Sequence, residues 1–148
     1  MLTIDAVRRS GVGIRPEQTI HEAAVLMEQT GVGSLAILDG DELVGILTDR
    51  DLVRRGVARG LADDARVDGV MTSPVVTIPA DADLHAAFAL FRSHAVRRLA
   101  VVRDKRFVGM VTIDDLLVDL AADLADLARP VTAEVLFGHH ESPVPATT

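Results

Sequence analysis

The chain has 148 residues, of which 49% are hydrophobic, and its formal net charge is −7 at pH 7. This length predicts about one domain with a real apolar core, and the acidic balance argues against a general nucleic-acid or anionic-membrane surface. The absence of cysteine excludes disulfides, thiolate metal sites and a cysteine nucleophile. The N-terminus has no signal-peptide layout and no long apolar run indicates a membrane span, so we expect a soluble cytoplasmic protein.

The first half of the chain predicts six elements. Thr19 and Glu22 have capping-box spacing, and the apolar residues after them recur at i, i+3, i+4 and i+7, which indicates an amphipathic helix. Asp39-Gly40 is a hairpin turn signal between two apolar runs, and Thr48 is placed to cap a following helix. The predicted elements are a helix over 3–9, a strand over 12–14, a helix over 20–30, strands over 35–38 and 43–47, and a helix over 49–57.

The same order of elements returns after a polar, alanine-rich connection over 58–69, in which a short helix over 66–70 is plausible. Asp83 is placed to cap the middle helix. We expect a leucine-rich last helix to end at Arg129-Pro130 and residues 142–148 to be disordered. The predicted elements are strands over 75–78, 99–102 and 107–111, a helix over 84–94, and the last helix from Thr112.

An internal repeat is the strongest signal in the sequence. Residues 12–53 align without a gap on residues 76–117, 64 positions later, and 13 of the 42 pairs are identical. We call these segments the first and second repeat. One copy of about 50 residues is marginal alone, so we expect the two to pack together and leave clefts between them. The predicted organisation is a first unit over 3–57, a connection over 58–69, a second unit over 70–128 and a partly disordered tail over 129–148.

Several motifs carry a resemblance to a known family. They are Met71-Thr72-Ser73-Pro74 before the second repeat, Val96-Arg97-Arg98 before its second strand, and a Gly-h-x-Thr-x-x-Asp pattern (h is apolar) over 45–51 and again over 109–115. In this order they resemble two tandem cystathionine-beta-synthase (CBS) domains, a Bateman module, over about residues 3–128. The first unit departs from the family pattern, because Val7-Arg8-Arg9-Ser10 stands where Met-Thr-x-Pro is typical. The resemblance implies an α/β (α+β) fold of two strand–helix–strand–strand–helix units with pseudo-two-fold symmetry and clefts between them.

The resemblance also implies a ligand and its site. CBS pairs commonly bind adenosine-containing ligands in these clefts, so the candidates are AMP, ADP, ATP and S-adenosylmethionine. The implied roles are ribose binding by the two aspartates, phosphate contact by the two threonines and by one arginine, and adenine binding beside each first strand with a valine wall. Gly33-Ser34 stands where the second repeat has the arginines, so we expect two unequal sites. The candidate residues are Gly13, Ile14, Val32, Thr48, Asp51, Thr77, Ile78, Val96, Arg97, Arg98, Thr112 and Asp115.

Each candidate also has a purely structural interpretation. The aspartates can serve as first-turn carboxylates that complement a helix dipole, the threonines as helix caps, and the arginines as solvated surface groups. His21 and His85 recur in the repeat, yet each lies in the first turn of an amphipathic helix and reads as a surface or core-rim residue. His139-His140 has few acidic neighbours in sequence, so a functional metal is not expected.

The resulting hypothesis is a regulatory, non-catalytic ligand sensor that acts through an unknown protein partner. No nucleophile–base pair, metal set or glycine-rich phosphate loop is recognisable. We expect a homodimer through the leucine-rich helix or the helices over 20–30 and 84–94, because a monomer would expose apolar surface. The alternative is an interaction scaffold whose clefts are filled by side chains. A further alternative is a different ligand, such as another nucleotide or a nucleic acid, and the net charge argues against nucleic acid.

Overall fold

The computed structural model describes residues 3–141, with side chains described over 3–128. The chain divides into two compact parts, of which the first ends at Ile113 and the second begins at Asp114. The first part, which we call the body, contains two three-stranded sheets. Among the described residues, no helix is both long and apolar enough to cross a membrane.

The first sheet is built from the first repeat, in the order β1-β2-β3. β1 runs parallel to β2, and β2 forms an antiparallel hairpin with β3. The helix α2 begins where Thr19 Oγ1 accepts a bond from the Glu22 N–H, and it ends at Gly31, which has φ 70°. Its buried face, which includes Met27, packs into the core with strand residues such as Leu35. The bounds are β1 (Gly13–Ile14), α2 (Ile20–Thr30), β2 (Ser34–Asp39) and β3 (Glu42–Thr48).

The second sheet repeats the first position for position. Leu35 pairs with Leu47 across the first hairpin, and the equivalent Leu99 pairs with Val111 across the second. Both hairpins carry a register irregularity at the same place, between Val101 and the next residue in the second repeat. The predicted two-unit α/β fold is therefore confirmed. The bounds are β4 (Thr77–Pro79), α4 (Leu84–His94), β5 (Arg98–Arg103) and β6 (Arg106–Thr112).

The helix that follows β3 differs from the sequence prediction. A single α-helix is expected over 49–57, but the structure has one α-helical turn, α3 (Asp49–Asp51), followed by a π-helix, η1 (Leu52–Val57). The Ala58 N–H bonds to the Val53 carbonyl at 2.8 Å, five residues back. Buried Gly56 lies in this stretch, and glycine weakens an α-helix, which helps to explain why the last turns widen.

The segments before the two repeats, over 3–11 and 67–75, each bond to the other repeat. We call them the first and second lead-in. Residues of α1 (Ile4–Val7) bond to the second repeat, where the Ile4 N–H reaches the Ala82 carbonyl at 2.8 Å, and Arg9 then bridges to Met110 of β6. Conversely, the 3-10 helix η2 (Val67–Gly69) packs into the core of the first repeat, and Thr72 bridges to Ile46 of β3. Each lead-in therefore completes the other repeat.

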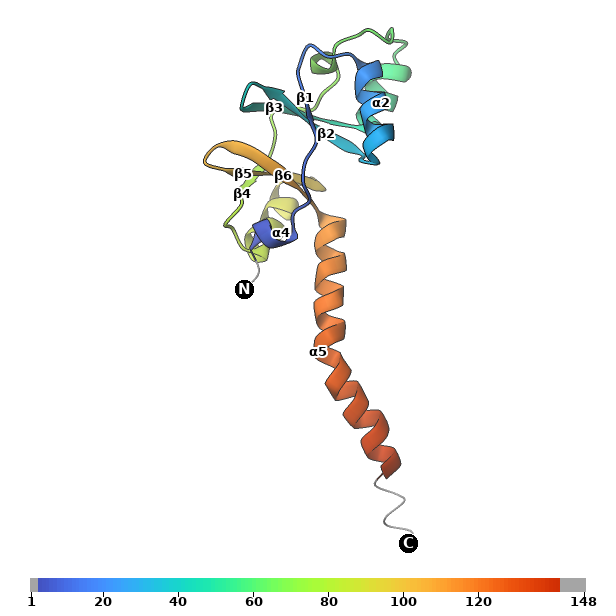
Figure 1. Ribbon diagram of the computed structural model, residues 1–148, viewed down its shortest axis with the longest axis vertical. Helices are drawn as coiled ribbons and strands as arrows, with labels where there is room; N and C mark the ends of the chain where they lie inside the picture. The colour runs from blue at the N-terminus through green and yellow to red at the C-terminus, as the bar shows by residue number, and fades with distance from the viewer. Residues whose placement is uncertain (1–2, 142–148) are drawn as a thin grey trace. The chain divides into compact units, whose positions relative to one another are not determined.

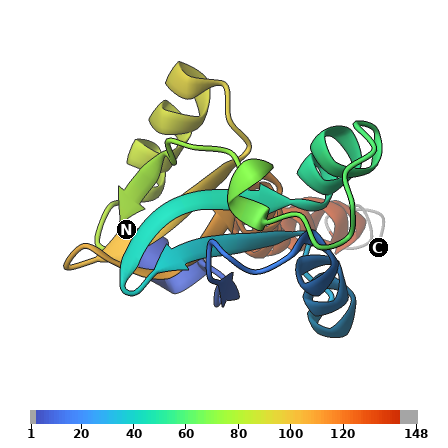
Figure 2. The same cartoon turned by 90° about the horizontal axis from the view of Figure 1, so that it is seen from above.

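The two sheets also share a hydrophobic cluster of Ile46, Ala100 and Met110. β3 contacts β6 at this junction, and Figure 1 shows the two sheets next to each other in the body. Figure 2, seen from above, shows the strands at the centre of the body, with α2 and η1 towards one side and α4 towards the other.

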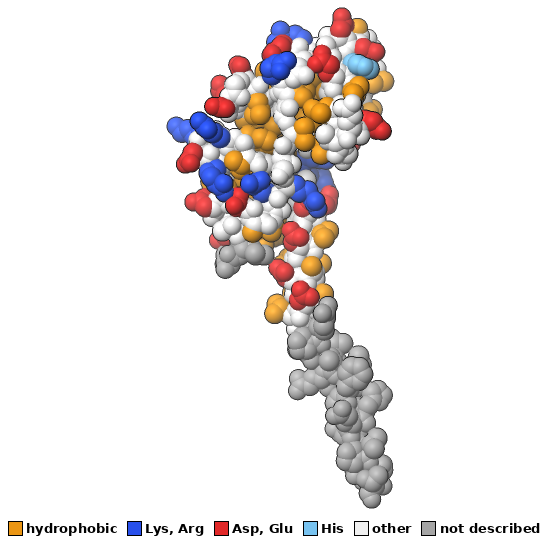
Figure 3. Space-filling model, viewed as in Figure 1, with side chains coloured by type: hydrophobic (Ala, Val, Ile, Leu, Met, Phe, Trp, Pro, Cys, Tyr) orange, Lys and Arg blue, Asp and Glu red, His pale blue; other side chains and the backbone are white. Residues whose placement is uncertain are grey.

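The last helix, α5 (Ile113–Glu141), is longer than the sequence predicts. An end at Arg129-Pro130 is expected, but the helix continues for a further eleven residues past Pro130. The proline ring holds φ at a helical value and removes only one N–H donor, so it weakens a helix without forcing it to stop. Figure 3 shows hydrophobic side chains along the described turns of α5, where Leu117, Leu124 and Leu127 are exposed. The disorder expected for 142–148 concerns residues outside the described range.

Candidate functional site

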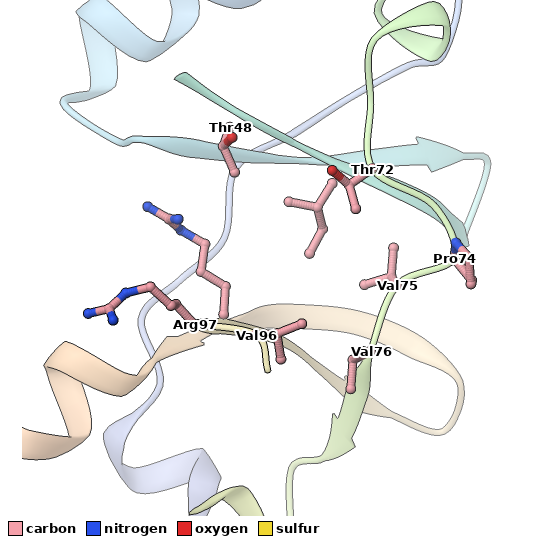
Figure 4. A pocket seen from close by; sticks show the side chains of 9 residues that line it. Thr48, Thr72, Pro74, Val75, Val76, Val96 and Arg97 are labelled. Atoms are coloured by element: carbon pink, nitrogen blue, oxygen red, sulfur yellow. The ribbon is translucent and has the colours of Figure 1, made fainter. Parts of the chain in front are cut away.

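A pocket opens between the two repeats in the body. Its cavity volume is about 190 Å³, and it opens to solvent. Three segments line it: the end of β3, the segment before β4 and the segment before β5. Figure 4 shows Thr48 and Thr72 on one side of the pocket and Val76 and Val96 on the other. Its lining residues are Ile46, Thr48, Thr72, Pro74, Val75, Val76, Val96, Arg97 and Arg98.

Backbone pairing explains why these segments meet. Thr72 and Ile46 exchange both of their N–H···O=C bonds, at 2.8 and 3.0 Å, so the second lead-in runs along β3. This pairing places Thr72 in the wall to which Thr48 also belongs. On the opposite side, the Ile113 N–H bonds to the Arg97 carbonyl at 3.0 Å, which anchors the segment before β5.

The chain enters that segment through an unusual turn. Ala95 follows α4 with φ 53°, in the left-handed region that favours glycine. The equivalent residue in the first repeat is Gly31, with φ 70°. The turn ends α4 and directs Val96 and the two arginines along the pocket.

Asp51 lies just behind the two threonines of the pocket. Its Oδ2 accepts the Thr48 N–H at 3.0 Å, and its own N–H donates to Thr48 Oγ1 at 3.0 Å, which completes a capping box. The Thr72 hydroxyl lies 3.3 Å from the same carboxylate oxygen and donates to it. These bonds fix the carboxylate, and an ionised carboxylate with about four acceptor sites still has capacity for a ligand hydroxyl.

The chemistry of the pocket is asymmetric. Apolar side chains form most of its wall, and the charged residues among its described lining are both arginines, Arg97 and Arg98. Arg98 reaches toward the first repeat: its Nη2 lies 3.7 Å from the point where a Cβ of Gly33 would stand. Such a pocket suits a molecule with one flat apolar end and one anionic end.

The equivalent positions on the other side of the pseudo-two-fold axis carry different side chains. Arg8 occupies the position that corresponds to Thr72, and its Nη1 donates to the Val108 carbonyl at 2.8 Å. Gly11 corresponds to Val75, and the Phe107 ring lies so close that an added Cβ would overlap it. The equivalent space therefore already holds a bonded guanidinium and an aromatic ring.

The structure brings only some of the predicted residues together. Thr48, Val96, Arg97 and Arg98 line the pocket. The other candidates do not line it. Asp51 bonds to two of the lining residues but is not itself among them. Ile14 and Ile78 are buried, Val32 packs on the core of the first repeat, Gly13 lies against Leu38, Thr77 lines another groove, Thr112 pairs with Arg98 at the end of β6, and Asp115 lies in the second compact part.

Sequence reasoning missed the contribution of the second lead-in. Thr72, Pro74 and Val75 belong to the Met-Thr-Ser-Pro motif and the residue after it, which was used only to place the start of the second unit. A hydroxyl and a proline just before a strand were a usable signal, but the crossing of the lead-in onto β3 shows itself only in the fold.

Comparisons with known proteins agree with this architecture. The sequence profile of a family described as CBS domain matches residues 5–58 and 67–122. The chain belongs to the CBS-domain family. It is similar to the uncharacterized protein YlbB of Bacillus subtilis, with 39% identity over 99 residues that cover 66% of this chain and 67% of YlbB. It is also similar to the CBS domain-containing protein YhcV of the same organism, with 38% identity over 106 residues that cover 72% and 76% of the two chains.

A solved structure adds information on a ligand. A CBS domain protein from Pyrobaculum aerophilum, complexed with AMP, matches with a TM-score of 0.70 and 25% sequence identity, over 82% of this chain and 99% of that chain. The resemblance drawn from the sequence motifs and the two-unit fold are thus confirmed, and one structural neighbour of this fold is complexed with AMP.

Proposed function

We propose that this CBS pair is a regulatory, non-catalytic module that binds an adenosine-containing ligand in the pocket between its repeats. The observation that carries the proposal is the composition of this pocket, in which an apolar wall and two arginines face the capped end of β3. The AMP complex of the Pyrobaculum protein supports the ligand class. The candidates are AMP, ADP, ATP and S-adenosylmethionine, in the cytoplasm, where these compounds are abundant.

In the proposed complex, each part of the ligand meets a matching group. Adenine lies against Val76 and Val96, and the ribose hydroxyls donate to the fixed carboxylate of Asp51. Phosphate oxygens accept bonds from Arg97 or Arg98, since planar guanidinium groups suit phosphate geometry. The equivalent cleft on the other side of the pseudo-two-fold axis is the weaker site, because Arg8 and Phe107 occupy its space.

Calorimetric titration with adenosine, AMP, ADP, ATP and S-adenosylmethionine tests the proposal. We expect saturable binding of at least one compound to the wild-type chain. The double variant Arg97→Gln/Arg98→Gln should weaken AMP binding about tenfold or more, because a hydrogen bond to a charged group contributes about 1.5–3 kcal/mol. Its affinity for adenosine, which has no phosphate, should change little.

The matched control is Arg92→Gln/Arg106→Gln. It makes the same change in net charge at two exposed residues that lie outside the pocket lining. Equal weakening of AMP binding in both double variants would show that the loss of affinity comes from the change in net charge. No binding of any of the five compounds to a folded wild-type chain would contradict the proposal and favour the alternative of a ligand-free interaction scaffold.

We also propose that a second copy of the chain covers the apolar face of α5. Leu117, Leu120, Leu124 and Leu127 are spaced by three, four and three residues, which is the a/d pattern of a helix that pairs with another. Their exposed fractions, between 37% and 73%, leave a stripe that a soluble chain would bury. Light scattering after chromatography should find a dimer, and Leu124→Glu should shift it toward the monomer.

A ligand signal would then pass to a protein partner, because the ligand would bind two arrangements of the dimer with different affinity.

A further inference from the structure

A second cavity lies next to the ligand pocket and has the opposite character. Its cavity volume is about 270 Å³, and its lining is polar. Four arginines and one aspartate line it: Arg50, Asp51, Arg54, Arg55 and Arg59. We call it the arginine cavity. The chain as a whole is acidic, with a net charge of −7, so a cavity with four positive groups and one negative group runs against the average charge.

The π-helix lies between the outer arginines: Arg50 is in α3, Arg54 and Arg55 are in η1, and Arg59 follows η1. In an α-helix each residue advances by about 100°, so Arg50 and Arg59, nine residues apart, would point in opposite directions. In η1 the bonds join residues five apart, from the Ala58 N–H to the Val53 carbonyl, and each residue advances less. Positions four and five residues apart then share a face, and all four arginines line one cavity. This widened turn is a departure from regular α-helix, which is frequent at functional sites.

The arginines are held in different ways. Arg55 is half-buried, and its Nη1 donates to the Met71 carbonyl at 3.0 Å, which orients its guanidinium from the second lead-in. Arg54 and Arg59 are exposed, and the structure gives neither side chain an ion pair with any described carboxylate. Bringing like charges together is unfavourable, so the arrangement is best satisfied by an added anion of high charge density.

Asp51 connects the arginine cavity to the ligand pocket. Asp51 is among the residues that line the cavity, and its carboxylate is bonded to Thr48 and Thr72, which line the pocket. An anion in the cavity could therefore be the far end of a molecule whose nucleoside lies in the pocket. It could also be a free anion of the same chemistry.

We propose that the arginine cavity is a binding site for a di- or triphosphate group. Several guanidinium forks can bond the adjacent oxygens of a phosphate chain, whereas a single phosphate or carboxylate would leave most of them unused. For the nucleotide source, the inference extends the proposed function: ADP and ATP bind more tightly than AMP. If the ligand is instead a free anion, the cavity binds inorganic polyphosphate and the ligand pocket takes no part.

The test compares inorganic tripolyphosphate, AMP and ATP by calorimetry at low salt without divalent cations. Tripolyphosphate should bind the wild-type chain, or ATP should bind it more tightly than AMP. Arg54→Gln/Arg59→Gln should weaken the triphosphate compound about tenfold or more and leave AMP unchanged. The control Arg92→Gln/Arg106→Gln removes two positive charges outside the cavity and should change neither affinity substantially. Thermal melts should confirm that both double variants are folded, which is expected for exposed positions.

The possible results separate this inference from the proposed function. Binding of tripolyphosphate that depends on Arg54 and Arg59, with no binding of adenosine compounds, would support the cavity and contradict the proposed nucleotide function. An ATP preference that depends on the same arginines, without binding of tripolyphosphate, would assign the phosphate chain to a nucleotide. Equal affinities of AMP and ATP with no tripolyphosphate binding would overturn the inference, as would equal weakening by the control.

Discussion

The two repeats share a backbone and differ in what they offer a ligand. Their strands pair in the same register, 64 residues apart, and even the hairpin irregularity recurs. Yet the second repeat presents Arg97 and Arg98 where the first has Gly33 and Ser34. The first lead-in fills its cleft position with Arg8, whereas the second offers the smaller Thr72. A few positions at the strand ends and in the lead-ins therefore make two equal folds into unequal sites.

Burial explains which positions are the same in the two repeats and which differ. Pairs such as Leu35 and Leu99 are identical and fully buried, because packing limits the volume allowed at both positions. The residues at the start of β2 and β5 are only partly buried or exposed, so packing limits them less and their charge can differ between the repeats. The following experiments compare equivalent positions, beginning with the largest effect.

Truncating the two buried leucines should affect both repeats to a similar extent. We expect Leu35→Ala and Leu99→Ala each to lower the free energy of unfolding by about 2–5 kcal/mol, as for other fully buried leucines. Because the lead-ins cross, each variant should unfold in a single transition for the body. Urea unfolding followed by circular dichroism measures both. A variant that unfolds one repeat alone would show that the repeats are independent.

Equivalent glycines should respond differently. A Cβ at Gly109 would overlap the carbonyl oxygen of Arg9, which is main chain, so Gly109→Ala should cost about 1–3 kcal/mol by overpacking. A Cβ at Gly45 would overlap the Met71 sulfur, at the far end of a flexible side chain. Gly45→Ala should therefore cost less. Equal losses in the unfolding free energy of the two variants would mean that the main chain at Arg9 shifts as easily as the Met71 side chain.

The left-handed residues that follow α2 and α4 allow a smaller test. A non-glycine residue in this conformation costs about 1–2 kcal/mol. Glycine avoids this cost but loses more chain entropy on folding, which offsets part of the gain in stability. Ala95→Gly should therefore stabilise by up to about 1 kcal/mol, and Gly31→Ala should destabilise by a similar amount. Thermal melts of the two variants should shift in opposite directions. A lower melting temperature for Ala95→Gly would contradict the strain argument.

The smallest expected effect concerns Asp5, which joins the first lead-in to the second repeat. Its carboxylate accepts bonds from Arg8 at 3.0 Å and Arg103 at 2.7 Å, and the bond from Arg8 is the main cause that lowers the pKa of Asp5 below 3.8. A lowered folded pKa stabilises the protein above pH 3.8, and this contribution is lost as the pH falls through the folded pKa.

Asp5→Asn should therefore melt slightly lower than wild type at neutral pH, and the difference should vanish once the pH falls below the folded pKa of Asp5. The effect should be small because the carboxylate is exposed. Asp41→Asn, at an exposed carboxylate that lies 3.9 Å from Arg106, is the control. A difference from wild type that persists at low pH would assign the role of Asp5 to packing instead of charge.

Much of this fold was predictable because its signals are local or repeated. Capping residues such as Thr19 and Asp83 accept bonds from their helices as their spacing predicts. The internal repeat predicted two similar units. The π-helix was not predictable from spacing, because it depends on how Gly56 packs and on contacts from other segments. The crossing of the lead-ins is likewise a long-range property of the chain.

The candidate site was predictable in part. Motif spacing indicated Thr48 and the arginines before β5, which the structure brings into one pocket. It did not show that one pocket combines the end of the first repeat with the lead-in of the second. Local pattern cannot report which of two equivalent copies a segment will pack against, since both offer nearly the same surface.

The crossed lead-ins have a consequence for how the chain could be divided. A cut in the connection over 58–66 would leave each fragment with the lead-in that its counterpart requires: the N-terminal piece keeps Ile4 and Arg9, which bond to the second repeat, and the C-terminal piece keeps Val67 and Thr72, which bond to the first. The fragments should fold poorly alone and reassemble when mixed, as a split protein does.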